Sequence, residues 1–234
     1  MFSKLMLIAR AEGTIPLHYS KLLTAAILSK IGQGSKELAA RLHENQIAYS
    51  DGPRIFKPLS HSWLIGLTKQ EDGFVAPHNQ VVLYLGWRGD VIEAFQKGLS
   101  ADPVMNIGET RLTATMTAEL PCEPVTNKFK AVSPVWAHYQ SRDILYSTDP
   151  ALFVQVISTN LRSKYKALYG KEYAGRLYLN PQKTRPLISR WGSFMVGANW
   201  GIYEIEAEYD MLKLALAAGI GKGNSIGFGM LDLL

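Results

Sequence analysis

The segment AGIGKGNSIGFG, residues 218–229, has five glycines within eleven residues of a 234-residue chain. Because glycine lacks a Cβ, such a run lets backbone N–H groups turn toward a common point and lets another backbone approach closely. The segment also holds Lys222, Asn224 and Ser225, whose side chains suit contacts to phosphate and sugar. A simple helix-to-strand turn needs only one glycine, so we interpret the segment as a binding loop.

The order of elements around this loop excludes two familiar nucleotide-binding motifs. A Walker loop needs Gly-Lys followed by Ser or Thr and then by a helix, but Lys222 is followed by Gly223 and a predicted strand. A dinucleotide fingerprint also needs a helix after its glycines, at another spacing. We therefore predict that the loop binds RNA, through Gly219, Gly221, Lys222, Gly223, Asn224, Ser225, Gly227, Phe228 and Gly229.

Outside the loop, the hydrophobic pattern predicts the same order of elements twice: strand, helix, two or more strands, helix, strand. In the first half the predicted helices are 20–31, 36–43 and 90–99, and the predicted strands are 2–11, 54–57, 62–68, 80–86 and 111–120. In the second half the predicted helices are 150–168 and 208–218, and the extended segments are 142–148, 174–180, 184–190, 193–198, 202–207 and 226–233. Ser35 is a predicted N-cap, and the segment GQGS is expected to break the first helix.

This order is typical of the split βαβ pattern, so we expect an α+β fold of two tandem ferredoxin-like (RRM-like) domains. Their predicted bounds are 1–121 and 127–234, with the proline-containing segment PCEPVTNKF, residues 121–129, as the linker.

Composition is compatible with a globular protein and a polyanionic partner. Hydrophobic residues make up 47% of the chain and charged residues 19%, while the net charge is +5 and the pI is about 9.2. No apolar run has the length of a membrane helix, and the N-terminal segment predicts a strand, not a signal peptide. The single cysteine, Cys122, excludes an internal disulfide. We expect a cytoplasmic protein that does not contact membranes.

The segment GIGKGNSIGFGML resembles the C-terminal signature of the CRISPR-associated repeat-RNA endoribonucleases, the Cas six family. That signature is a glycine-rich loop with Asn-Ser, then Gly-Phe-Gly and an apolar residue, in the second of two ferredoxin-like domains. VSPV, residues 132–135, is similar to the strand that opens the family's second domain. LAARLHE, residues 38–44, resembles the helix with the catalytic histidine, and GPRIFKPLSHS, residues 52–62, resembles the basic strand after it.

The resemblance implies an enzyme that cuts CRISPR repeat RNA into guide RNAs and needs neither metal nor cofactor. The ribose 2′-OH would attack the adjacent phosphate, giving a 2′,3′-cyclic phosphate and a 5′-OH. Such chemistry needs a group that accepts a proton, a group that donates one, and a cation beside the charged phosphorane. By the resemblance, His43 is the catalytic histidine, and Arg54 or Lys57 is the cation.

The tyrosine that the family often has on its first helix is missing, because the matching position is Leu28. Tyr49, six residues after His43, is our candidate for the second proton-transfer group, with Tyr19 beside His18 as the alternative. The identity of this group stays open.

The other histidines match no metal-ligand spacing, and we interpret them as ordinary polar residues: His61, His78 and His138. KTRPLISR, residues 183–190, resembles the family's hairpin that enters an RNA stem, which implies RNA contacts by Lys183, Arg185 and Arg190.

The expected partner is CRISPR repeat RNA, with the protein acting as a monomer or a homodimer. Two alternatives stay open, a non-catalytic RNA-binding member of the family and a subunit of a CRISPR effector complex.

Overall fold

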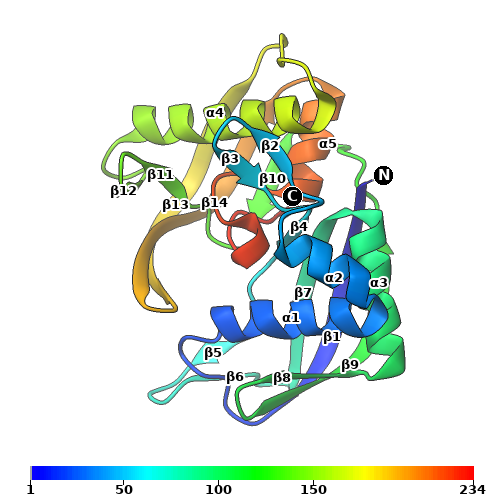
Figure 1. The fold of residues 1–234 in the computed structure, drawn as a ribbon. Coiled ribbons are helices and arrows are strands. Elements are labelled where there is room, and N and C mark those ends of the chain that lie inside the picture. Colours follow the sequence, from blue (N-terminus) through cyan, green and yellow to red (C-terminus); the bar gives the residue numbers. More distant parts are fainter. Residues whose placement is uncertain (1) are drawn as a thin grey trace.

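Two antiparallel sheets, one from each half of the chain, organise this computed structural model, which describes residues 2–234 (Figure 1). The first sheet has the order β4-β7-β1-β9-β8, from β4 (Leu59–His61), β7 (Gln80–Arg88), β1 (Phe2–Glu12), β9 (Thr110–Leu120) and β8 (Val104–Ile107). The second has the order β13-β14-β10-β15, from β13 (Tyr178–Trp191), β14 (Phe194–Glu206), β10 (Lys128–Ala131) and β15 (Leu231–Leu233). In the first sheet the opening strand β1 lies between β7 and β9, and in the second sheet the opening strand β10 lies between β14 and β15. The prediction of two tandem ferredoxin-like units is therefore confirmed.

Side-chain N-caps mark the starts of two of the helices in the described part of the chain. The first half contains α1 (Ser20–Gly34), α2 (Lys36–His43) and α3 (Gly89–Ala101), and the second contains α4 (Pro150–Tyr169) and α5 (Tyr209–Ala218). Ser35 caps α2 by accepting the backbone N–H of Leu38 at 3.2 Å, as predicted. Asp149 caps α4 in the same way, and Gly170 ends it with a φ of 70°.

The first helix ends within GQGS, as predicted, but three residues later than expected, because Gly34 is its last residue. A Cβ on Gly34 would lie 1.8 Å from the carbonyl oxygen of Ala94, and one on Gly98 would lie 2.0 Å from that of Lys30. These glycines therefore allow α1 and α3 to pack closely.

Four further predictions differ from the structure. The predicted strand 62–68 is mostly irregular, and the first sheet uses Leu59–His61 there instead. The short strand β8 was not predicted. The extended segments predicted between 174 and 207 form just two long strands, β13 and β14, with a bulge after Gln182. Of the predicted strand 226–233, only Leu231–Leu233 is a strand, because a 3₁₀ turn, Asn224–Ile226, precedes it.

The two halves are joined by buried polar contacts as well as by the connecting segment. Lys4 Nζ on β1 lies 2.8 Å from Asp232 Oδ1 and donates to the carbonyl oxygen of Leu231 at 2.9 Å, and Lys4 is only 1% exposed. Ser60 donates to the carbonyl oxygen of Ala217 at 2.8 Å. The predicted domain bounds, 1–121 and 127–234, stay a prediction.

Three small two-stranded sheets lie outside the main ones: β2 (Tyr49–Asp51) with β3 (Arg54–Phe56), β5 (Thr68–Lys69) with β6 (Phe74–Val75), and β11 (Ala137–Tyr139) with β12 (Arg142–Ile144). The β2–β3 hairpin leaves the first half and lies against α4 (Figure 1). Lys166 of α4 reaches Asp51 of this hairpin, with Nζ 3.5 Å from Oδ1. Within residues 2–234, none of the helices combines the length and apolarity needed to cross a membrane.

Candidate nucleic-acid interface

The glycine-rich loop is organised from within by the side chain of Asn224. Its amide nitrogen donates to the carbonyl oxygens of Ile220, at 3.0 Å, and of Phe228, at 2.9 Å, so it joins the two ends of the loop. Asn224 is 7% exposed. Its predicted role as an RNA contact needs correction, because its side chain is turned into the protein and used there.

A buried lysine on α4 binds the other side of this amide. Lys164 Nζ lies 2.6 Å from Asn224 Oδ1 and donates to the carbonyl oxygens of Gly219, at 2.7 Å, and of Gly221, at 3.4 Å. Burial lowers the pKa of Lys164 to about 7, because an ammonium group loses its hydration there. The loop conformation therefore depends on a titratable group that is not itself exposed.

The five glycines of the loop all have positive φ values, between 70° and 94°. A Cβ on Gly229 would lie 1.8 Å from the carbonyl oxygen of Ile220, and one on Gly227 would lie 2.9 Å from the ring of His61. The glycines therefore serve close packing of the loop on itself and on its surroundings. Gly219, Gly227, Phe228 and Gly229 are buried, which is a correction to their prediction as direct RNA contacts. Gly221 is buried but lines a cleft beside the loop, so its RNA contact stays a prediction, while Lys222 is exposed and Gly223 and Ser225 are half-buried.

His61 lies beneath the loop as a buried structural histidine. Its Nε2 lies 3.1 Å from Thr24 Oγ1 of α1, and its Nδ1 lies 2.9 Å from the carbonyl oxygen of Ser62. Burial lowers its pKa to about 4, so the ring is neutral at physiological pH. This agrees with its interpretation as an ordinary polar residue.

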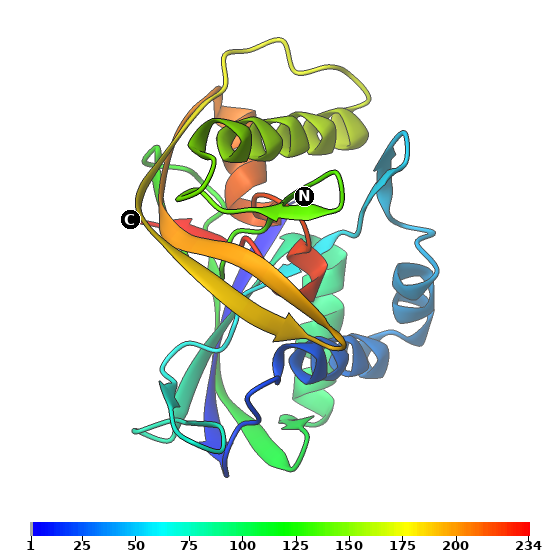
Figure 2. The same ribbon diagram turned by 90° about the vertical axis from the view of Figure 1, so that its left-hand side faces the viewer.

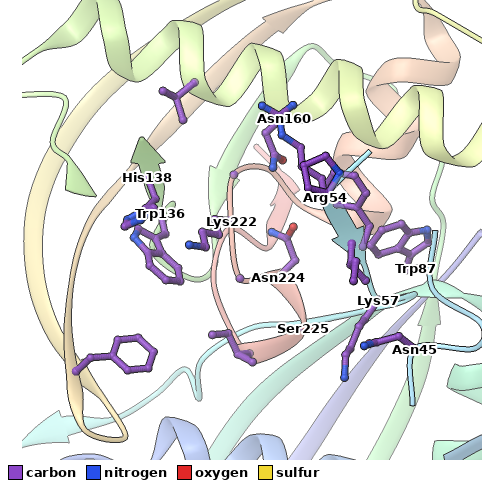
Figure 3. Close-up of a pocket in the computed structure, with 18 residues that line it drawn as sticks. Asn45, Arg54, Lys57, Trp87, Trp136, His138, Asn160, Lys222, Asn224 and Ser225 are labelled. Atoms are coloured by element: carbon purple, nitrogen blue, oxygen red, sulfur yellow. The ribbon is translucent and has the colours of Figure 1, made fainter. Parts of the chain in front are cut away.

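A cleft of about 750 Å³ opens beside the loop, between the two halves of the chain. One wall contains Asn45, Arg54 and Lys57 from the first half, and the opposite wall contains Trp136 and His138 from the second (Figure 3). Lys222, Asn224 and Ser225 lie between these walls, and α4 contributes Asn160 (Figure 3). The cleft therefore has the cationic groups of Arg54 and Lys57 from the first half and of Lys222 from the second, which suits a polyanionic ligand.

Comparison with known proteins agrees with this geometry. The family described as "CRISPR associated protein Cas6, C-terminal" matches residues 120–233. The CRISPR-associated endoribonuclease Cas6 1 of Methanocaldococcus jannaschii is 26% identical, over 92% of this chain and 86% of its own length. The CRISPR-associated endoribonuclease Cas6 of Pyrococcus furiosus is 23% identical, over 94% and 83% respectively. A solved structure described as CRISPR associated protein Cas6 superposes with a TM-score of 0.83 at 23% identity, covering both chains completely.

The chain is thus similar to Cas6 proteins along most of its length. The resemblance found in the glycine loop is thereby confirmed, and it extends through both halves of the chain.

Of the residues that the Cas6 resemblance singled out in the first half, Arg54 and Lys57 line the cleft, whereas His43 is not among the lining residues. His43 is the last residue of α2 and is exposed. Lys57 Nζ lies 3.5 Å from the carbonyl oxygen of His43, at the helix end where a cation is favoured. Arg54, on the β2–β3 hairpin, donates to Ser163 of α4. The structure thus brings Lys57 to His43 and links Arg54 to the second half.

The candidate tyrosines are engaged elsewhere. The ring of Tyr49 stacks on that of Trp87, with centroids 5.9 Å apart and an interplanar angle of 17°. Tyr19 is 5% exposed, and its hydroxyl accepts the backbone N–H of Leu64 at 3.2 Å. Leu28 packs against the core of the first half. The alternative of Tyr19 therefore needs correction, whereas Tyr49 as the second proton-transfer group stays a prediction.

The basic segment 183–190 forms most of the outer strand of a long hairpin. Figure 2 shows β13 and β14 running from the second half toward α1, and a Cβ on Gly192 at the tip would lie 3.6 Å from Lys21 Cδ. Lys183, Arg185 and Arg190 are exposed along this strand. Their RNA contacts, implied by the Cas6 resemblance, stay a prediction.

The sequence reasoning missed the role of Lys164. The sequence did contain a sign of this role, because Lys164 continues the helical spacing of an apolar stripe on α4 that is formed by Phe153, Ile157 and Leu161. A lysine on the buried stripe of a helix indicates an internal hydrogen-bonding role. Among residues 2–234, no three His, Cys, Asp or Glu side chains lie where they could hold a metal ion.

Proposed function

We propose that this protein is an endoribonuclease that cleaves CRISPR repeat RNA to give guide RNAs. The observation that carries the proposal is the cleft between the two halves, which is lined by Arg54, Lys57 and Lys222, with Lys57 Nζ 3.5 Å from the backbone carbonyl oxygen of His43. Two relatives along most of the chain bear the name CRISPR-associated endoribonuclease, which supports the same activity.

The proposed reaction uses the RNA's own 2′-OH as the nucleophile and leaves a 2′,3′-cyclic phosphate and a 5′-OH. His43 transfers a proton at one of the two reacting oxygens, since histidine can give or take protons near neutral pH. Lys57 or Arg54 stabilises the negative charge that develops on the phosphorane. In this scheme Lys222 and Ser225 hold the RNA backbone, while Lys183, Arg185 and Arg190 contact a stem.

One observation favours a second candidate, an RNA-binding member of the family that does not cut. Leu28 stands at the position of the family's tyrosine, and Tyr49 is stacked on Trp87. If no other group supplies the second proton transfer, the cleft would still bind RNA but would leave it intact.

A cleavage assay in EDTA separates the two candidates. Repeat RNA is incubated with the wild type, with His43→Ala and with His78→Ala, a variant of an exposed histidine outside the cleft. We expect the wild type and His78→Ala to cut, and His43→Ala to cut at least 100-fold more slowly, on the order of the loss of a general acid or base. A repeat with a 2′-deoxy ribose at the cut site should bind and stay intact. Intact RNA with the wild type, or cutting that requires a divalent metal, would contradict the proposed reaction.

The proposed partner is CRISPR repeat RNA. A CRISPR effector complex is a second partner that was predicted from the sequence. The choice between monomer and homodimer and the cytoplasmic location are likewise predictions from the sequence. Sedimentation of the protein with and without repeat RNA would test the first of these.

A further inference from the structure

His138 lies in a hydrogen-bonded pair that leaves one of its ring nitrogens facing the cleft. It stands opposite Asp143 across the β11–β12 pair, and its Nδ1 lies 2.8 Å from Asp143 Oδ1. The same carboxylate accepts the indole N–H of Trp136 at 2.7 Å and the backbone N–H of Gly197 at 2.7 Å. Burial opposes ionisation of Asp143, but these donors outweigh it and hold the pKa of that carboxyl below its usual range.

This arrangement fixes the tautomer of His138. An ionised carboxylate can only accept hydrogen bonds, so the hydrogen of the neutral ring is on Nδ1 and Nε2 is left for a ligand. Within residues 2–234 no protein group bonds Nε2, and the side chain is 27% exposed on the cleft wall. Protonation of the ring adds an Nε2–H donor, whose direction is set by the half-buried carboxylate of Asp143.

Lys222 is held next to this histidine. Its backbone N–H donates to the carbonyl oxygen of Trp136 at 2.8 Å, and its Nζ lies 4.7 Å from the centroid of the Trp136 ring. No carboxylate within residues 2–234 pairs with Lys222. Trp136 therefore has the Lys222 cation over its ring and a histidine two residues along, and Trp136 and His138 lie on the wall opposite Lys57 (Figure 3).

An aromatic ring lies beside this pair. Phe194 opens β14 and is 42% exposed, and its ring centroid is 6.5 Å from that of Trp136. An exposed ring near a lysine and a histidine suits a nucleotide, whose base can stack while its phosphate binds these two side chains.

We propose that His138 and Lys222 together bind one phosphodiester of the RNA, with the neighbouring base against Phe194, at a subsite separate from the cutting site near Lys57. The proposal rests on RNA occupying the cleft, as in the proposed function. Asp143 acts as a positioning residue that directs the His138 ring.

The test uses repeat RNA with a 2′-deoxy ribose at the cut site, so that binding is measured without cleavage. Fluorescence anisotropy gives the affinities of the wild type, His138→Gln, Lys222→Met and the double variant, with His78→Gln as the matched control. Each single variant should bind about tenfold more weakly, as expected for loss of a charge-assisted hydrogen bond. The double variant should lose clearly less than the product of the two effects, because both groups hold one phosphate. Fully additive losses, or wild-type affinity of His138→Gln, would overturn the proposal.

Single neutral methylphosphonate linkages, moved one position at a time along the same RNA, locate the phosphate. One linkage, away from the cut site, should weaken binding to the wild type but not to the double variant. If no such linkage exists, or if it is the cut linkage, the subsite does not exist as described. A 5′-mononucleotide titrated in parallel should bind far more weakly than the RNA. Equal affinity would contradict the proposal, because it would indicate a pocket for free nucleotides. A wild type that shows this pattern but leaves unblocked repeat RNA intact contradicts the proposed cleavage and leaves the subsite standing.

Discussion

The ammonium nitrogen of Lys164 lies 2.6 Å from the side-chain oxygen of Asn224, and this contact joins α4 to the centre of the glycine-rich loop. Replacing Lys164 with methionine keeps most of the volume but leaves the Asn224 oxygen and the Gly219 carbonyl without their donor. We expect a loss of about 2 kcal/mol in the free energy of unfolding, together with weaker RNA binding, because buried acceptors without partners are costly. Urea unfolding and anisotropy would measure the two effects. Lys166→Met, on a half-exposed position of the same helix, should change either quantity little.

The same lysine predicts how stability depends on pH. Burial lowers its pKa from 10.5 to about 7 in the folded protein, so between these values the unfolded chain binds more protons than the folded one. The contribution of Lys164 to the free energy of unfolding is greatest above pH 10.5, the pKa of lysine in the unfolded chain. This contribution falls by at most about 1.4 kcal/mol per pH unit as the pH decreases toward 7. The free energy of unfolding of the wild type should therefore rise from pH 7 to pH 9 relative to that of Lys164→Met. Parallel pH profiles of the two proteins would contradict this.

Two glycines with the same backbone conformation provide a test of close packing in the loop. Gly229 and Gly170 both have φ values of 70°, but a Cβ on Gly229 would lie 1.8 Å from a carbonyl oxygen, whereas one on Gly170 would meet nothing within 4 Å. Gly170→Ala should cost about 1 kcal/mol, the strain of a left-handed backbone alone. Gly229→Ala should cost several times more and abolish RNA binding. Thermal melts of both variants give the comparison, and equal losses would mean that the loop tolerates a side chain there.

Lys57 should matter for the chemical step more than for binding. Its ammonium group lies against the carbonyl end of α2, beside His43. Lys57→Ala should lower the single-turnover cleavage rate about 100-fold, on the order of the loss of one charge-stabilising group, with a small change in affinity. Lys97→Ala, on an exposed face of α3, is the matched control for a lost positive charge. A cleavage rate of Lys57→Ala equal to that of this control would assign the cation's role to Arg54.

The fold was predictable because local signals agree with it. Ser35 at the start of α2 and Gly170 after α4 mark their helices through capping geometry that depends only on neighbouring residues. The end of α1 was predicted three residues too early because the sequence does not show that α3 lies against Gly34. The same limit applies to β8, since four residues at a sheet edge have too little pattern to be recognised.

The site was less predictable because its parts come from distant segments. Sequence reasoning assigned Asn224 to RNA and His138 to no special role. In the structure the Asn224 side chain lies inside the loop, and the orientation of His138 comes from Asp143 across a hairpin. Which polar side chain of a loop turns inward is decided by partners such as Lys164, sixty residues away.

The contact between Lys4 and Asp232 has a consequence for the protein during its synthesis. The two residues are 228 positions apart, so at a rate of about 5–20 residues per second a ribosome needs on the order of ten seconds or more to supply the partner. During that interval the first sheet can form only with an unpaired lysine at a position that later becomes buried. The contact between Lys4 and Asp232 is therefore one of the last that can form during synthesis, after the rest of the first sheet has left the ribosome.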